Sequence, residues 1–227
     1  MIDGHGDDIY SYEGIRMNFS SNIYAHADLS GLEAHLCRHL NAIRSYPEPS
    51  PRSLEKMIAN KYGVDADEVL VTSGATDAIY LIAQAFRDRK TYHVFHPAFS
   101  EYEDACRMYG YEEQPDGAIG WLCNPNNPTG DVTDAELMER IVAECERCRV
   151  KLIVDECFMD FADEGLRCRK LYDSENVIII RAFTKICAMP GIRTGYSISK
   201  DKAFNLRLRQ IGQCWSVSVP AQVAGAE

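Results

Sequence analysis

The strongest constraint on the fold of this chain is a repeated alternation of short apolar runs with helical patterns. Runs with the length and composition of buried strands occur at 69–72, 92–95, 119–123, 150–155 and 177–183. Between most of them lie segments with the apolar spacing of amphipathic helices, at 76–87, 100–109 and 134–147. This alternation predicts an α/β protein with a largely parallel sheet.

The first part of the chain departs from the alternation. Residues 1–48 hold one helical pattern, near 29–40, within an irregular segment that ends in RSYPEPS. A second helix is expected to begin after Ser50 and to end at residue 60, with Ser50 as N-cap and Pro51 at the first helical position. Thr133 is the expected N-cap of the helix at 134–147. We therefore expect an N-terminal arm, residues 1–48, and one large domain, residues 49–227.

Composition narrows the class of protein. The chain has 227 residues, of which 46% are hydrophobic, and a net charge of −10 from 24 Lys and Arg against 34 Asp and Glu. This balance argues against a nucleic-acid partner or an anionic membrane surface, which need clustered cations. The apolar runs are too short to span a bilayer, and the first ten residues lack a signal-peptide layout. A cytoplasmic protein is expected.

The nine cysteines are scattered without disulfide-like spacing, which fits a reducing compartment. Cys145 and Cys148 form a C-x-x-C motif late in a predicted helix. No second pair lies at zinc spacing, so we expect no metal site there.

Polar features follow four of the predicted strands. TSGAT follows the first run, NPNNPTG the third, Asp155-Glu156 the fourth and Thr184-Lys185 the fifth. The carboxyl ends of parallel strands meet at one edge of the sheet, where ligands bind in α/β proteins. These features therefore predict one ligand site at that edge.

Two of the features are loops. The backbone amides of Gly74, Ala75 and Thr76 open a helix and can cradle a phosphate, although an ordinary strand-to-helix turn explains them as well. In NPNNPTG two prolines and a glycine hold the loop in one shape. Such rigidity indicates that a side chain is being aimed, and the candidate is Asn127, whose amide both donates and accepts hydrogen bonds.

Three charged residues complete the set. Asp155 is a cap, a metal ligand or the partner of a proton on a heterocyclic nitrogen. Lys185 is a surface charge or, if desolvated beyond its buried strand, a nucleophilic amine. Arg193, which follows a Pro-Gly turn, suits a bidentate grip on phosphate. Together with the phosphate cradle and Asn127, these groups describe pyridoxal 5′-phosphate as the ligand.

The motifs SGATDAIYL, NPNNPTG, VDECFMDF and TKICAMPGIRTGY, in this order, resemble the fold-type I pyridoxal-phosphate aminotransferases of class I and II. The resemblance implies a three-layer α/β/α sandwich around a mostly parallel mixed sheet. It also implies that Lys185 attaches the cofactor covalently, that Asp155 pairs with its ring nitrogen, and that Asn127 binds its phenolic oxygen.

The same resemblance assigns further cofactor contacts. Arg193 would bind the cofactor phosphate, and Phe99 would stack on the pyridine ring. Tyr46, in YPEP, is similar to a tyrosine that crosses a dimer interface to the phosphate of the partner's cofactor. A homodimer with shared sites is therefore implied.

Three departures from the family pattern stand out. Ala182 replaces a hydroxyl residue that often contacts the phosphate, and Phe158 replaces a tyrosine that often bonds the phenolic oxygen. Beyond the position of Glu227 the family continues into a small C-terminal domain with the arginine for the substrate carboxylate. The resemblance thus implies that this small domain is absent here.

The opening, GHGDD followed by NFSSNIYAHADL, resembles threonine-phosphate decarboxylases of cobalamin synthesis. It implies His5 and Asn22 as ligands of a phosphorylated amino-acid substrate, although Asp7 and Asp8 depart from the usual His-Gly-Gly. His5 is otherwise an ordinary residue of a loose terminus. The expected reaction is decarboxylation of L-threonine O-3-phosphate. The alternatives are a histidinol-phosphate type of aminotransferase and a cofactor-binding fragment without turnover.

Overall fold

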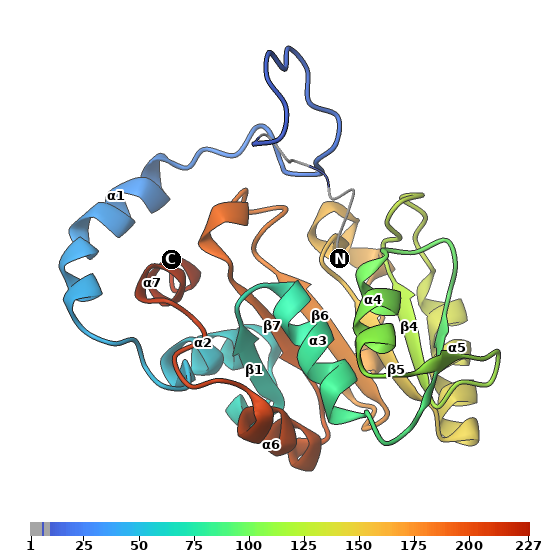
Figure 1. Ribbon diagram of the computed structural model, residues 1–227. Helices are drawn as coiled ribbons and strands as arrows, with labels where there is room; N and C mark the ends of the chain where they lie inside the picture. Colours follow the sequence, from blue (N-terminus) through green and yellow to red (C-terminus); the bar gives the residue numbers. More distant parts are fainter. Residues whose placement is uncertain (1–5, 7–9) are drawn as a thin grey trace.

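The computed structural model describes residue 6 and residues 10–227 (Figure 1). One sheet holds the strands β1 Val69–Thr72, β2 Thr91–Val94, β3 Glu112–Glu113, β4 Ile119–Cys123, β5 Lys151–Asp155, β6 Val177–Ala182 and β7 Gly195–Ile198. The α-helices are α1 Ser30–Arg38, α2 Arg52–Tyr62, α3 Ala75–Ala85, α4 Glu101–Met108, α5 Ala135–Cys148, α6 Lys202–Ile211 and α7 Val219–Gly225.

The sheet has the strand order β1-β7-β6-β5-β4-β2-β3. All pairs are parallel except those of β7, which lies antiparallel between β1 and β6. The predicted, mostly parallel sheet is therefore confirmed, and each predicted strand occurs within one residue of its expected bounds. The sequence prediction missed β3, which is two exposed glutamates, and β7, whose four residues follow a Gly-Pro-rich turn.

Helices cover both faces of the sheet, as the predicted three-layer sandwich requires. Side chains alternate along β6, so Ile178 and Ile180 face α3, α4 and α6, whereas Val177 and Ile179 face α2, α5 and α7. Two separate apolar cores result, one on each face. In Figure 1, α3 and α4 lie on the side of the sheet that faces the viewer.

Two predicted helix caps are wrong. Helix α5 is capped by Asp134, whose Oδ1 accepts from the backbone N of Leu137 at 2.8 Å, whereas Thr133 lies one residue too early. Helix α2 begins after Pro51, and Glu48, not Ser50, supplies the side chain that caps its first turn. Glu48 Oε2 accepts from the backbone N of Ser53 at 2.9 Å. Ser50 Oγ instead accepts from the guanidinium of Arg209 at 3.1 Å.

The N-terminal arm carries the helix expected near 29–40, α1, followed by a 3₁₀ turn at Leu40–Arg44. No residue of α1 is buried, and the helix contacts α7 (Figure 1). His35 Nδ1 of α1 lies 2.7 Å from Oε2 of Glu227, two residues beyond the end of α7. Before α1, the backbone N of Tyr24 donates to the carbonyl oxygen of Lys185 at 3.1 Å. The arm is thereby tied to the edge of the sheet where the site was predicted.

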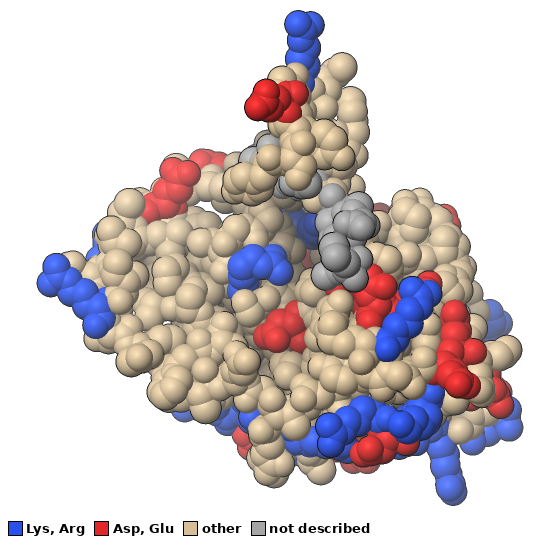
Figure 2. All heavy atoms as spheres, in the orientation of Figure 1, with Lys and Arg blue, Asp and Glu red and all other residues tan. Residues whose placement is uncertain are grey.

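The surface carries charges of both signs. On the face in Figure 2, Lys and Arg side chains lie interspersed with Asp and Glu. Within the described ranges no helix has the length and apolar character of a membrane span. Cys145 and Cys148 lie on α5 as expected, and residue 6 and residues 10–227 contain no group of three side chains that could bind a metal.

Candidate functional site

A cavity of about 160 Å³ lies beyond the carboxyl ends of β4, β5 and β6. It brings together many of the residues that the sequence singled out: Ala75, Thr76, Phe99, Asn127, Asp155, Lys185 and Arg193. Its other lining residues are Tyr102, Cys123, Cys157, Phe158, Thr184 and Pro190. These residues come from six separate stretches of chain, so the sheet edge gathers them as the parallel topology predicts.

Asp155 sits at the floor of this cavity with 5% of its surface exposed. Its Oδ2 accepts from the phenol of Tyr102 at 2.7 Å, and its Oδ1 accepts from the backbone N of Cys157 at 2.9 Å. Burial, and then the charge of Asp155, raises the pKa of Tyr102 well above its usual value, so the phenol stays protonated and keeps donating. The carboxylate is therefore fixed in orientation by two donors.

Sequence reasoning missed Tyr102. Tyr102 lies three positions after Phe99, and this spacing places both side chains on one side of the chain where α4 begins. The spacing could therefore have indicated that Tyr102 accompanies Phe99 in the site. What the sequence could not supply is the stacking of Tyr102 on Trp121, whose rings lie 5.3 Å apart at 10°. That stacking directs the phenol toward Asp155.

Two thiols adjoin the same carboxylate. Burial raises the pKa of Cys123 to about 12 and that of Cys157 well above the usual thiol value, and the charge of Asp155 adds to both shifts. Both cysteines are therefore neutral near pH 7. No thiolate therefore stands beside the Asp155 carboxyl group to compete with it for a cationic ligand.

The turn before α3 lies directly against Arg193. A Cβ atom at Gly74 would lie 2.6 Å from Arg193 Nη2, so only glycine lets the guanidinium approach this closely. Arg193 Nη1 also donates to the carbonyl oxygen of Pro190 at 3.2 Å. A guanidinium and the N-terminal amides of α3 thus stand together at one end of the cavity, an arrangement suited to phosphate.

We expect the Gly74→Ala substitution to lower the free energy of unfolding by about 1–3 kcal/mol, because position 74 has a φ of +85° that a residue with a Cβ rarely adopts. The guanidinium of Arg193 would also have to swing away. Urea unfolding of the purified chain measures the loss. Gly31→Ala in α1 is the control, since its Cβ would meet nothing within 4 Å. Equal stability of the two variants would contradict the expectation.

The prolines and the glycine account for the expected rigidity of the Asn-Pro loop, and the structure adds hydrogen bonds from two of its asparagines. Buried Asn124 accepts from the backbone N of Thr133 at 2.8 Å, and Asn126 Nδ2 donates to the carbonyl oxygen of Pro97 at 2.8 Å. These two asparagines anchor the loop to its neighbours. Asn127, between the anchors and Pro128, lines the cavity.

Lys185 enters the cavity from the segment that follows β6. Its Nζ lies 5.8 Å from the centre of the Phe158 ring, on the face of the ring. Phe158 therefore forms a wall beside the lysine amine. Like Phe158, Ala182 departs from the family pattern. Ala182 is buried in the core and does not line the cavity.

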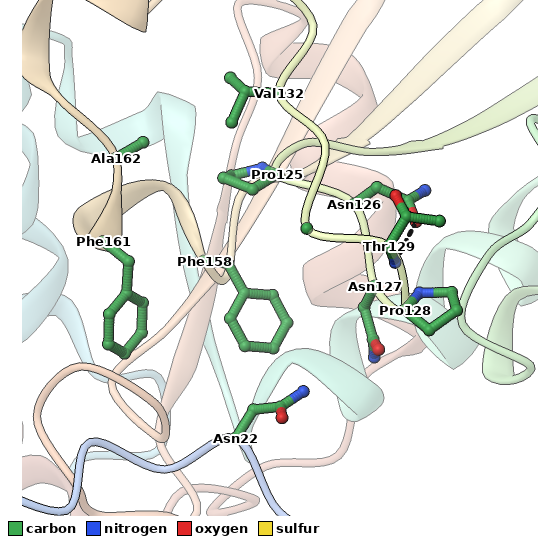
Figure 3. A pocket seen from close by; sticks show the side chains of 11 residues that line it. Asn22, Pro125, Asn126, Asn127, Pro128, Thr129, Val132, Phe158, Phe161 and Ala162 are labelled. Atoms are coloured by element: carbon green, nitrogen blue, oxygen red, sulfur yellow. Dashed lines mark hydrogen bonds between the residues drawn. The ribbon is translucent and has the colours of Figure 1, made fainter.

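A second cavity, of about 390 Å³, adjoins the first and shares Asn127 and Phe158 with it. Asn22 of the N-terminal arm lines this second cavity, and Figure 3 shows its amide below Phe158 and near Asn127. Phe161 and Ala162 form another part of the wall. The residue predicted to bind substrate thus lies next to the residues predicted to bind cofactor. His5 lies outside the described residues.

Tyr46 does not line either cavity of its own chain. Its side chain is 83% exposed and its ring lies 5.1 Å from that of Trp215. Because the sequence prediction assigns Tyr46 to the site of a second copy, this assignment stays a prediction.

The family model for aminotransferase class I and II matches residues 15–116 and 111–227. A threonine-phosphate decarboxylase from Salmonella typhimurium is 30% identical over 231 residues, which cover 92% of this chain and 63% of that protein. A histidinol-phosphate aminotransferase from Ruminiclostridium cellulolyticum is 28% identical over 183 residues, which cover 69% of this chain and 50% of that protein.

The solved structure of L-threonine-O-3-phosphate decarboxylase from Porphyromonas gingivalis matches with a TM-score of 0.82 and 31% identity, over 91% of this chain and 66% of that one. Members of the matching family bind pyridoxal 5′-phosphate. The chain belongs to the class I and II aminotransferase family. It spans 63% of the length of the Salmonella relative.

Proposed function

We propose that this chain binds pyridoxal 5′-phosphate in the smaller cavity. The chemistry of the donor set fits the cofactor: Arg193 with the amides of Ala75 and Thr76 suits the phosphate, and Asp155 suits a protonated ring nitrogen. The observation that carries the proposal is that a buried, oriented carboxylate and a lysine from adjacent strand ends line one cavity with a guanidinium. Asn127 would face the phenolic oxygen, and Phe99 the ring.

The cofactor, when bound, acts as an electron sink for a bond to the substrate α-carbon. The residues of the chain supply the rest. Asp155, held by Tyr102, keeps a proton on the ring nitrogen, and Lys185 attaches the cofactor and moves protons near the reacting carbon. Phe99 and Phe158 exclude water from that side of the cavity.

The proposed reaction is decarboxylation of L-threonine O-3-phosphate to aminopropanol phosphate, a step of cobalamin synthesis. Its support is the identity to threonine-phosphate decarboxylases and the position of Asn22 on the adjoining cavity. Asn22, from the adjoining cavity, would hold the substrate phosphate and so set which substrate bond is oriented for cleavage. A grip from that side would present the carboxylate rather than the α-hydrogen, which would favour decarboxylation over amino-group exchange.

We expect the protein to release CO₂ and form aminopropanol phosphate from threonine phosphate when no 2-oxoacid is present. Asn22→Ala should raise the KM for threonine phosphate by about tenfold, the effect of losing one hydrogen bond to a charged group. Asn18→Ala is the control, because this exposed asparagine lines neither cavity. Turnover that requires 2-oxoglutarate and yields glutamate would contradict the assignment.

The second candidate is a histidinol-phosphate type of aminotransferase, favoured by the 28% identity to the Ruminiclostridium protein. Histidinol phosphate with 2-oxoglutarate is the corresponding assay. Cofactor binding without turnover of either substrate would instead identify a cofactor-binding fragment. The threonine-phosphate assay and the histidinol-phosphate assay together distinguish the decarboxylase, the aminotransferase and the fragment without turnover.

We further propose that the protein is a cytoplasmic homodimer. Leu40, Ile43, Tyr46 and Trp215 are large apolar side chains that stay exposed in the single chain, and Tyr46 is the residue assigned to the partner's site. Sedimentation should show a dimer at micromolar concentration. A monomer that still binds the cofactor would remove Tyr46 from the site.

A further inference from the structure

A buried ion pair that the proposed chemistry does not use lies next to the cavity, on the face of the sheet that α2 and α5 cover. Arg181 of β6 and Glu156, the residue after β5, are 1% and 2% exposed. Arg181 Nη1 donates to Glu156 Oε2 at 3.2 Å, and Arg181 Nη2 donates to Asp160 Oδ1 at 2.5 Å. Arg167 also donates to Asp160, at 2.9 Å.

Three tyrosines enclose the pair. The phenol of Tyr172 donates to Glu156 Oε2 at 3.2 Å, and the guanidinium of Arg181 lies 5.3 Å from the ring centre of Tyr62. The hydroxyls of Tyr62 and Tyr196 are 2.9 Å apart. Burial raises the pKa of each of these phenols, so they surround the ion pair as neutral groups.

The ion pair joins the two strand ends that carry the candidate site. Asp155 lines the cavity, whereas Glu156, the next residue, does not, and its carboxylate bonds Arg181 and Tyr172 instead. Side chains alternate along β6, so Arg181, four residues before Lys185, shares the α2 and α5 face of the sheet with Ile179. The backbone N of Glu156 also donates to the carbonyl oxygen of Ile180 at 2.8 Å. The pair therefore connects β5 to β6 at the point where the cavity begins.

We infer that Arg181 and Glu156 are positioning residues, whose ion pair fixes Asp155 and Lys185 relative to each other across the β5 and β6 ends. The consequence for cofactor binding rests on the proposed function, whereas the coupling between the strand ends does not. A buried ion pair often stabilises a fold no more than apolar side chains would. An arginine–carboxylate pair does fix the relative orientation of its two groups, because the planar guanidinium binds carboxylates in a fixed geometry.

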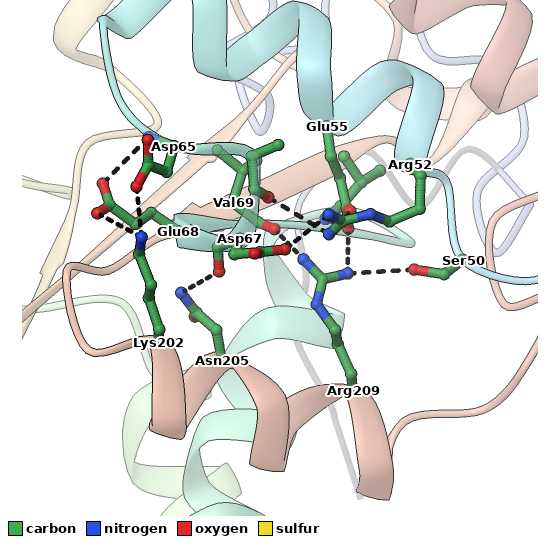
Figure 4. Close-up of polar contacts among 12 residues, drawn as sticks. Ser50, Arg52, Glu55, Asp65, Asp67, Glu68, Val69, Lys202, Asn205 and Arg209 are labelled. Carbon is green, nitrogen blue, oxygen red and sulfur yellow. Dashed lines mark hydrogen bonds and ion pairs between the residues drawn. The ribbon is translucent and has the colours of Figure 1, made fainter.

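The test compares two buried glutamates. Glu156→Gln removes the charge but keeps the shape of the side chain. The matched control is Glu55→Gln in α2, because Glu55 is fully buried and accepts from Arg209 at 2.7 Å and from Arg52 at 3.0 Å. Figure 4 shows that this control cluster joins α2 to α6 beside β1. Glu55 lines neither cavity of the site.

The first measurement is hydrogen exchange of the cofactor-free chain, followed by mass spectrometry. Glu156→Gln should speed exchange at least about tenfold at 155–160 and 181–186, because local opening there loses its ionic link. Glu55→Gln should speed exchange in α2 and β1 instead. Unchanged exchange at 155–160 and 181–186 in Glu156→Gln, or equal acceleration there in both variants, would overturn the inference.

The second measurement is the Kd for pyridoxal 5′-phosphate. We expect Glu156→Gln to weaken binding about tenfold or more, since small misplacements of site groups have large effects, and Glu55→Gln to change it less than about twofold. Tyr172→Phe removes only one hydrogen bond to Glu156 and should weaken cofactor binding in the same direction by a smaller factor. This variant replaces Glu156→Gln in the test if Glu156→Gln does not fold. If the unaltered chain binds no cofactor, the proposed function fails, while hydrogen exchange still decides the inference.

Discussion

Replacing Lys185 with alanine is expected to lower turnover of the phosphorylated substrate by about 10²–10⁴-fold, the usual effect of removing a group that transfers protons at the reacting centre. The loss of covalent attachment of the cofactor adds to this effect. Steady-state assays with saturating pyridoxal 5′-phosphate measure it. The fold should tolerate the change, since the Lys185 side chain lines a cavity and is only partly buried.

Borohydride reduction gives a second, independent measurement of the same prediction. After reduction and peptide mapping, the cofactor label should be found on Lys185 in the unaltered protein and be lost in Lys185→Ala. Lys200→Ala is the control, because Lys200 lies beyond β7 and lines neither cavity of the site. A label that persists on Lys151 or Lys200 would show that the lysine has been assigned wrongly.

Asp155→Asn is expected to lower turnover by about 10²–10³-fold, the effect of removing one preorganised electrostatic group from an active site. The amide has nearly the shape of the carboxylate and can still accept from the backbone N of Cys157, so the change acts mainly on charge. Without that charge the proton on the ring nitrogen is no longer held. Asp155 would thus no longer support the electron-sink chemistry that the bound cofactor would supply.

Asp201→Asn serves as the control for Asp155→Asn. Asp201 caps α6 and pairs with Lys151 at 2.9 Å, so its replacement affects stability at a place far from the cavity. Turnover at a temperature well below unfolding should be unchanged in this variant. Comparable activity of Asp155→Asn and the unaltered protein would refute the role of Asp155 as partner of the ring nitrogen.

The sequence determined the strands and the order of the polar features after them. The runs at 69–72 and 119–123 coincide with β1 and β4, because strands buried on both faces have nearly continuous apolar sequences. Once the strands are parallel, the segments after them share one edge. The convergence of Asn127, Asp155 and Lys185 on one cavity follows from that rule alone.

Only the tertiary structure decided which further residues surround these features. Strand β7, inserted antiparallel between β1 and β6, ends a Gly-Pro-rich segment and has no apolar pattern long enough to identify it. Tyr102 bonds Asp155 and Arg193 lies against Gly74 through contacts between residues far apart in the chain.

The ion pair of Arg181 and Glu156 could not be predicted from the sequence either. A charged residue at a strand end is expected to be exposed unless its partner is known. Local sequence encodes the spacing of side chains along one strand or helix. The pairing of side chains across the sheet depends on which elements become neighbours, and that is settled by packing of the whole chain.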